Sequence, residues 1–294
     1  MSRVVASYTT LPSRYDEVKQ SILTLKNQTH KLDAIYLTIP KKSRRLNKEY
    51  PPIPDDLAEL CTIVYSDIDY GPITKIYGGL VSEKDQNTVI ISCDDDVLFA
   101  PNHIEILLSH HKTHPKSAIC GTGALIGKGL YFISIFSTVK PSEYWNGLTG
   151  FNLDKNGRKV DLIFGVAGVL YVRNFFPSND LLHDTLFKYS LEDDAIFHND
   201  DVLISGYLSK QKITRYVFPD IPTIDHVNGP DALSSDIFKM LSRLNTSIQK
   251  VKEIGYFTEM EELSISETCL TKVFFLIIII IIIVIIGVFA YNSL

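Results

Sequence analysis

A buried strand that runs directly into three consecutive aspartates is the feature that most limits how this chain can fold. Residues 88–93 are mostly apolar or β-branched, and Asp94, Asp95 and Asp96 follow them. In an open α/β sheet, ligands bind at the carboxyl ends of the strands, so acids placed there face a crevice. Three adjacent carboxylates repel one another, and we expect a cation to offset that repulsion.

The oxygen atoms of these aspartates suit a hard divalent cation. Mg²⁺ and Mn²⁺ prefer such ligands, and both commonly bridge a protein carboxylate to a substrate diphosphate. In an extended chain Asp94 and Asp96 point to one side and Asp95 points to the other. We therefore expect Asp94 and Asp96 to hold the metal, while Asp95 meets a ribose or a neighbouring backbone amide. The alternative is a polar turn after the strand, because aspartate is common in turns.

The composition narrows the class of protein and of partner. The 294 residues are 45% hydrophobic and 21% charged, which is typical of a globular chain with one large core or two small ones. A net charge of -5 argues against nucleic acid as the main partner. Four scattered cysteines lack the paired spacing of a zinc site or a disulfide framework, so we expect a reducing, cytosolic setting.

The C-terminal region differs in kind from the rest. Residues 273–290 are an unbroken apolar stretch dominated by isoleucine, which predicts a single transmembrane helix. Lys272 precedes it, so the positive-inside rule places the preceding domain in the cytosol, and the N-terminal residues do not resemble a secretory signal. The alternative, a buried core helix, is disfavoured because the stretch has no polar face. We expect a globular domain over 1–255, a linker over 256–272 and a membrane tail anchor over 273–290.

Strands and helices alternate along the first half of the chain. This order predicts an α/β fold with a mainly parallel sheet and helices on both faces. The expected strands cover residues 3–8, 34–39, 62–65, 88–92 and 118–120, and the expected helices cover 15–26, 55–60, 74–81 and 102–111. Beyond Gly121 the pattern is less regular, and we expect strands over 131–135 and 161–164 and a helix over 236–254.

A second pair of acids opens another predicted helix. Asp200 and Asp201 precede Val202, Leu203 and Leu208, whose spacing predicts an inward-facing side. A helix N-terminus stabilises a carboxylate. One acid could cap the helix while the other faces a pocket as a base, or both could serve as caps, because acids are ordinary in a first turn.

These segments resemble a known enzyme family when they are taken together. They are residues 9–14 (TTLPSR), 69–75 (DYGPITK), 94–96 (DDD), 168–173 (GVLYVR) and 200–208 (DDVLISGYL). In this order they resemble the nucleotide-sugar-dependent glycosyltransferases of the GT-A fold, specifically a family-2-like group from bacteria and large DNA viruses. The resemblance implies a GT-A-like, Rossmann-type sheet, a metal-bridged nucleotide diphosphate sugar as donor and a glycan or other hydroxyl-bearing acceptor.

The resemblance also implies roles for the donor site. The loop after the first strand holds the base and ribose in such enzymes, so Thr9, Pro12 and Arg14 are candidate donor contacts, although Arg14 could equally be a surface residue of the following helix. Asp69 is a candidate acceptor of a hydrogen bond from the base or ribose, and Lys75 is a point charge suited to a phosphate. The alternative for this second segment is an ordinary turn-to-helix junction.

The remaining implied roles concern the metal and the base. Asp201, with Asp200 beside it, matches the second carboxylate pair of the family and is our candidate catalytic base. His226 is a candidate third metal ligand, because GT-A enzymes often bring a C-terminal histidine or acid to the metal. The alternative for His226 is an ordinary loop residue.

We therefore expect a membrane-anchored glycosyltransferase that uses Mn²⁺ or Mg²⁺ and inverts the sugar by direct displacement. A nucleotidyltransferase is a rival reading, but it would favour a glycine-rich basic loop for the triphosphate, and residues 9–14 contain no glycine. A membrane-tethered scaffold that has lost turnover is the non-enzymatic rival. The resemblance and the isoleucine run suggest a viral origin, in which case the membrane is that of a host or a virion.

Overall fold

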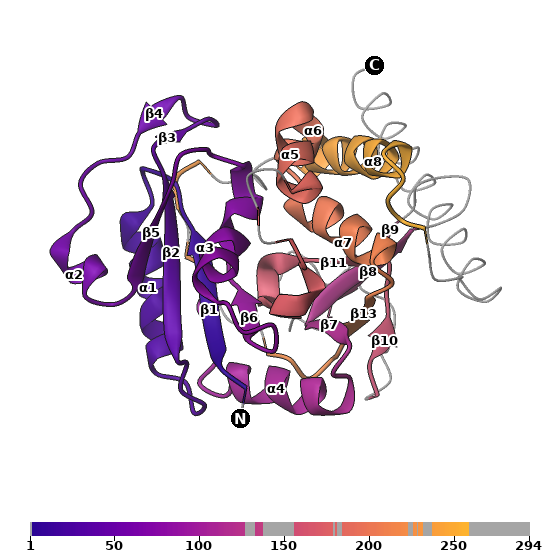
Figure 1. Ribbon diagram of the computed structural model, residues 1–294, viewed down its shortest axis with the longest axis horizontal. Coiled ribbons are helices and arrows are strands. Elements are labelled where there is room, and N and C mark those ends of the chain that lie inside the picture. Colours follow the sequence, from indigo (N-terminus) through magenta and orange to yellow (C-terminus); the bar gives the residue numbers. More distant parts are fainter. Residues whose placement is uncertain are drawn as a thin grey trace, which may run out of the picture.

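The central element of the fold is a sheet of eight strands covered by helices on both faces (Figure 1). The computed structural model describes residues 2–126, 133–137, 156–178, 180, 184–222, 226–227, 229–231 and 237–258. Within these residues the strand order is β10-β13-β7-β12-β6-β1-β2-β5, and most neighbours are parallel. The expected α/β, Rossmann-like architecture with a mainly parallel sheet is confirmed.

The elements follow one another along the chain as strands and helices in alternation. The strands of the large sheet are β1 (Val4–Thr9), β2 (Ala34–Pro40), β5 (Thr62–Ser66), β6 (Val89–Ser92), β7 (Ser117–Cys120), β10 (Arg158–Lys159), β12 (Val169–Val172) and β13 (Thr214–Val217). A small sheet contains β8 (Thr122–Ile126), β9 (Ile133–Ser137) and β11 (Leu162–Ile163), and a hairpin contains β3 (Lys42–Ser43) and β4 (Lys48–Glu49). The helices are α1 (Tyr15–Lys26), α2 (Asp55–Ala58), α3 (Thr74–Ser82), α4 (His103–Thr113), α5 (Thr185–Glu192), α6 (Asp194–Phe197), α7 (Asp200–Lys210) and α8 (Ile237–Glu253), with short 3₁₀ turns η1 (Gly71–Ile73), η2 (Gly165–Ala167) and η3 (Arg173–Phe175).

One strand of the large sheet is antiparallel to both of its neighbours. β12 lies between β6 and β7 and is antiparallel to both, with Val169 opposite Ser92. Because β12 runs the opposite way to β6, the residues that enter β12 lie beside the residues that leave β6. This places η2 next to the three aspartates that follow Ser92.

Alternate residues of the central strands face the two helical layers. Ala6 and Ile91 are paired in register and belong to the core packed under α1 and α4. Val5 and Ile90 are also paired, and they belong to the opposite core, which contains residues of α3 and α7. Side chains of consecutive strand residues point to opposite faces, so a strand covered on both sides reads as a continuous apolar run.

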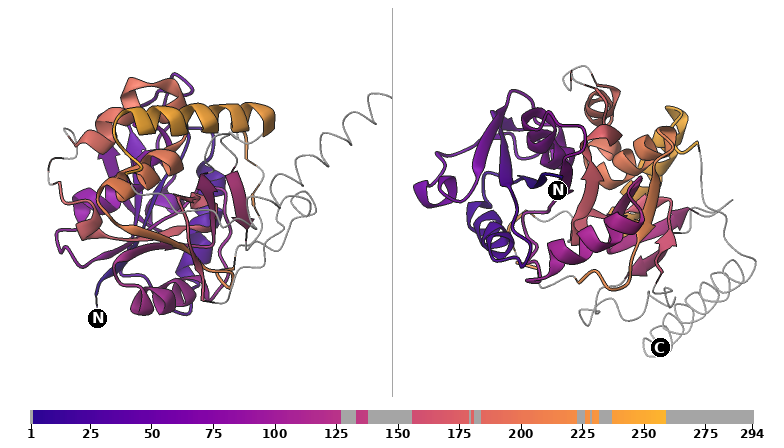
Figure 2. Two further views of the ribbon diagram at one scale, coloured as in Figure 1. Left: turned by 90° about the vertical axis from the view of Figure 1, so that its right-hand side faces the viewer. Right: turned by 60° about the horizontal axis from the view of Figure 1, so that its bottom comes forward.

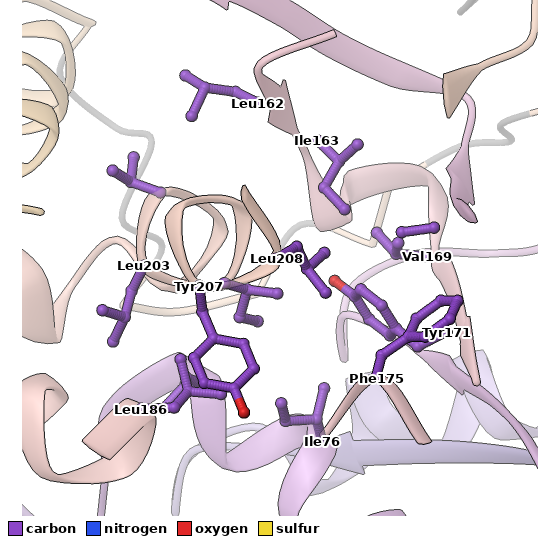
Figure 3. Packing of buried hydrophobic residues seen from close by; sticks show 14 of the residues in the cluster. Ile76, Leu162, Ile163, Val169, Tyr171, Phe175, Leu186, Leu203, Tyr207 and Leu208 are labelled. Atoms are coloured by element: carbon purple, nitrogen blue, oxygen red, sulfur yellow. The ribbon is translucent and has the colours of Figure 1, made fainter. Parts of the chain in front are cut away.

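Helix α7 is almost entirely enclosed. Its residues 202–209 are all buried, so apolar and small residues occur on every side and the helix shows little amphipathic pattern. Figure 3 shows Tyr207 and Leu208 of α7 among Ile76 of α3, Leu186 of α5 and Tyr171 of β12. α8 packs against α7 (Figure 2). A Cβ built at Gly206 would lie 2.5 Å from the Val251 Cγ1 atom. The close packing of α8 therefore depends on the glycine.

Most of the expected elements are present, with shifted ends. The helix expected over 15–26 has those bounds, and the helix expected over 236–254 is α8. Asn102 is the N-cap of α4, and its side chain makes no capping hydrogen bond. The strand expected over 131–135 appears as β9, Ile133–Ser137, and the strand expected over 161–164 is β11.

The predicted tail anchor lies outside the described residues. Among the residues that the structure describes, no helix has the length and hydrophobicity needed to cross a bilayer. Residues 273–290 are not among them, so the anchor stays a prediction.

The contribution of the central strands can be measured at Ile90, which is fully buried in β6. We predict that Ile90→Ala lowers the free energy of unfolding by about 2–5 kcal/mol, because it leaves a cavity between the sheet and α3. Chemical denaturation measures this. Leu23→Ala is the control on α1, where the leucine is 40% exposed, and it should change stability by no more than about 0.5 kcal/mol. Equal losses at the two positions would contradict this assignment of the core.

Candidate functional site

The three aspartates after β6 form ion pairs with two different cationic side chains. The Asp94 carboxylate pairs with Lys75, with 2.6 Å between Nζ and Oδ1. Asp95 and Asp96 both pair with Arg14, at 3.0 and 2.7 Å. The expected extended alternation, with Asp94 and Asp96 on one side, is wrong because Asp95 and Asp96 lie in a turn.

Lys75 connects this turn to the start of α7. Its Nζ atom lies 2.6 Å from Asp94 Oδ1 and 2.9 Å from Asp200 Oδ2, and the residue is only 4% exposed. Burial alone would lower the pKa of Lys75, but the carboxylates of Asp200 and Asp94 together raise it well above its usual value. Lys75 is therefore a buried ammonium shared by two acids, one from each of the carboxylate groups that the sequence singles out.

Asp201 is held at the same place by the backbone of η2. The Gly165 amide donates a hydrogen bond of 3.0 Å to Asp201 Oδ1. A Cβ at Gly165 would lie 2.6 Å from Lys75 Nζ and 3.2 Å from Asp201 Oδ1, so a side chain there would displace the ammonium. Burial, and then the nearby Asp200 charge, raise the pKa of Asp201 well above its usual range, against the lowering effect of Lys75. A carboxylate with a raised pKa is a better proton acceptor near neutral pH.

Neither acid of the pair acts as the helix cap. The N-cap of α7 is Asn199, which makes no side-chain capping bond. Asp200 instead pairs with Lys75, and Asp201 accepts from Gly165. The expectation that at least one of the two caps the helix is wrong, because both carboxylates turn toward the end of β6.

The ion pairs of Arg14 with Asp95 and Asp96 also involve a buried side chain. Arg14 is 6% exposed and occupies the N-cap position of α1, so it is not a surface residue of that helix. Thr10 Oγ1 donates a hydrogen bond of 2.7 Å to Asp95 Oδ2. Burial raises the pKa of Asp95 to about 7, although Arg14 and Thr10 act in the opposite direction.

A segment distant in sequence reaches Asp96. The Val227 amide donates to the Asp96 carbonyl at 2.8 Å, and His226 Nδ1 lies 4.0 Å from Asp96 Oδ1. The imidazole is half exposed. The structure thus brings the third candidate metal ligand beside one of the other two.

The side chains of Thr9 and Asp69 form hydrogen bonds with backbone groups. Thr9 Oγ1 donates to the Thr38 carbonyl. The Asp69 carboxylate accepts from the amides of Gly71 and Arg44 at 2.8 and 2.7 Å, so it stabilises the turn before η1. Pro12 is half-buried in the loop after β1. The turn-to-helix alternative therefore describes the contacts of Asp69, whereas Lys75 in the same segment joins the carboxylate cluster.

The donor atoms suit a divalent cation that is shared with a substrate. Asp94 and Asp96 each use one carboxylate oxygen in an ion pair and have a second oxygen. In the described part of the chain, no group of three or more His, Cys, Asp or Glu side chains is arranged to hold a metal by itself. Mg²⁺ at a diphosphate needs only one or two protein carboxylates, because phosphate oxygens and water complete its shell. The carboxylates of the cluster outnumber its cations: they are Asp94, Asp95, Asp96, Asp200 and Asp201, against Lys75 and Arg14.

Two residues of this site were not predicted from the sequence. Gly165 has no role predicted from the sequence, although its amide holds Asp201 and its missing side chain leaves room for Lys75. Thr10 is not among the candidate residues of the 9–14 segment, although its hydroxyl binds Asp95. No local pattern marks either contact, because both join residues at least 36 positions apart in the chain.

Comparison with known proteins gives no family for this chain. No family model matches it, and no curated protein is significantly similar to it.

The hydrogen bond from Thr10 to Asp95 provides a direct test of the cluster. We predict that Thr10→Val lowers the free energy of unfolding by about 1–3 kcal/mol, because a buried carboxylate loses a donor. Thr246→Val is the matched control on an exposed face of α8, and it should have an effect within about 0.5 kcal/mol. Equal free energies of unfolding for the two variants would show that the Thr10–Asp95 hydrogen bond does not stabilise the fold.

Proposed function

We propose that this chain is a metal-dependent glycosyltransferase of the GT-A type, which transfers a sugar from a nucleotide diphosphate sugar to an acceptor hydroxyl. One observation carries the proposal. Lys75 bridges Asp94 and Asp200, and so Asp201 lies beside the aspartates at the end of β6. A group suited to take a proton is thus next to groups suited to hold a metal diphosphate.

The donor occupies the carboxyl end of β6 in this proposal. Asp94 and Asp96 would hold Mn²⁺ or Mg²⁺, and His226 beside Asp96 would be a further ligand. A cation held there would supply neutralisation of the negative charge on the leaving nucleoside diphosphate. Arg14 keeps Asp95 and Asp96 in place through its two ion pairs. Thr9, Pro12 and Asp69 complete the proposed donor site through the resemblance alone.

Asp201 is the proposed base. It accepts the proton of the acceptor hydroxyl while the acceptor oxygen forms a bond to the anomeric carbon. The bond from that carbon to the diphosphate breaks, and the leaving group takes the electron pair. Its raised pKa favours this proton transfer, and the Gly165 amide fixes one carboxylate oxygen so that the other can face the acceptor. A single displacement of this kind inverts the configuration at the sugar.

The proposed acceptor class rests on the resemblance, and the proposed location rests on the C-terminal apolar stretch and the charge that precedes it. A glycan or another hydroxyl-bearing molecule is the proposed acceptor. The apolar stretch at 273–290 is proposed to anchor the enzyme in a membrane with the catalytic domain in the cytosol. A virus is the proposed source, with a host or virion membrane as the site.

The role of Asp201 is tested by release of nucleoside diphosphate from a panel of nucleotide sugars with Mn²⁺. We predict that Asp201→Asn lowers the turnover rate by about 10²–10⁴-fold, because the amide cannot accept the proton, while donor binding is retained. Asp194→Asn is the matched control: this aspartate opens the preceding helix, its side chain is 84% exposed, and the variant should keep the native rate.

Two outcomes would contradict the proposal. A folded native chain that releases no nucleoside diphosphate from any nucleotide sugar would remove the glycosyltransferase function and favour a scaffold. Full turnover by Asp201→Asn would remove this residue as the base.

A further inference from the structure

Lys75 occupies the position of an internal counter-ion. Its ammonium contacts one carboxylate at the end of β6 and one at the start of α7, at 2.6 and 2.9 Å. Both the lysine and Asp200 are buried, whereas the Asp94 side chain is 31% exposed. Asp94 is therefore the partner that an incoming ion can reach, and Asp200 is the partner enclosed by the protein.

The space around the ammonium restricts where it can go. A Cβ at Gly165 would lie 2.6 Å from Lys75 Nζ and 3.5 Å from Asp94 Oδ1, so the backbone of η2 closes one side of the pair. The lysine stem lies in α3 between buried core residues such as Ile76. A cation that displaces Lys75 from Asp94 leaves it with Asp200 as its ion-pair partner at 2.9 Å, and the Asp201 charge also acts on the ammonium.

A divalent cation at Asp94 must compete with this contact. Two positive charges within a few ångströms repel strongly where water is largely excluded. An ammonium that has a second buried carboxylate available can give up the first without becoming an unpaired buried charge, which would be costly. Asp200 thus lowers the free-energy cost of breaking the Lys75–Asp94 ion pair when a metal binds Asp94.

We propose that Lys75 is a resident cation that holds the carboxylate cluster together without metal and transfers to Asp200 when a divalent ion takes Asp94. Lys75 is then a positioning residue, which sets the metal affinity of the donor site and links the occupation of that site to the first turn of α7. The inference rests on the proposed function for the assumption that Asp94 and Asp96 hold the metal.

The test measures binding of Mn²⁺ alone, without a nucleotide, by the electron paramagnetic resonance signal of free Mn²⁺ in a titration of the full-length chain. We expect Lys75→Met to bind Mn²⁺ about tenfold more tightly, because the competing charge is gone. Lys84→Met is the matched control, an exposed lysine just after α3, and its affinity should equal that of the native chain.

A second variant gives a change of opposite sign. Asp200→Asn removes the alternative partner, so Lys75 stays on Asp94 and Mn²⁺ binding weakens by about three- to tenfold. In the Lys75→Met background the same substitution should change the affinity by less than about threefold, because no ammonium remains to be redirected. Circular dichroism of each variant establishes that it is folded, and Asp200→Asn alone tests the inference if Lys75→Met does not fold.

The outcomes separate this inference from the proposed function. Unchanged or weaker Mn²⁺ binding in folded Lys75→Met, or additive effects of the two substitutions, overturns the role of Lys75. Sugar transfer by the native chain is measured separately, so normal transfer together with such results overturns the inference alone. A native chain that shows no saturable Mn²⁺ binding overturns both the inference and the metal dependence of the proposed function.

Discussion

Repulsion between carboxylates at the end of β6 is the constraint on which the rest of the site depends. Acids from two distant parts of the chain meet there, and within the described residues Lys75 and Arg14 form ion pairs with them at 3.0 Å or less. Lys75 comes from α3 on one face of the sheet, and Arg14 comes from the start of α1 on the other. Each cation connects its own helical layer to the acids after β6 through ion pairs. The charge balance of the site therefore depends on the packing of the two layers.

The antiparallel strand β12 completes this arrangement. Because it enters the sheet beside the end of β6, its preceding turn brings the Gly165 amide to Asp201. α7 is buried on nearly all sides, which fixes the position of its first turn against the sheet. These two features place the acids at the end of β6 beside the acids at the start of a rigid helix, and the proposed direct displacement requires both in one place.

The sequence predicts the alternating elements better than it predicts the contacts between them. α1, α3 and α8 were expected at nearly their observed bounds, because apolar spacing is a local signal. β12 and β13 were not assigned as strands, because short buried segments lack a distinctive period. The antiparallel course of β12 also depends on its pairing with strands far away in the sequence.

The site shows the same limit. The carboxylate clusters at Asp94 and at Asp200 were identified from their place after a strand and at the start of a helix. Their connection through Lys75 was not identified from the sequence. A lysine shortly after Gly71 and Pro72 is equally consistent with a phosphate contact. Local sequence gives the charge of such a residue, whereas its partner is decided by the tertiary packing.

The most direct test of the central claim is the thermal stability of the folded chain with a panel of nucleotide sugars, with and without Mn²⁺. We predict that one nucleotide sugar raises the melting temperature only when Mn²⁺ is present, and that Asp96→Ala abolishes this rise, because a ligand that binds the native state stabilises it by mass action. A native chain whose melting temperature does not respond to any nucleotide sugar with Mn²⁺ would contradict a donor site at the end of β6.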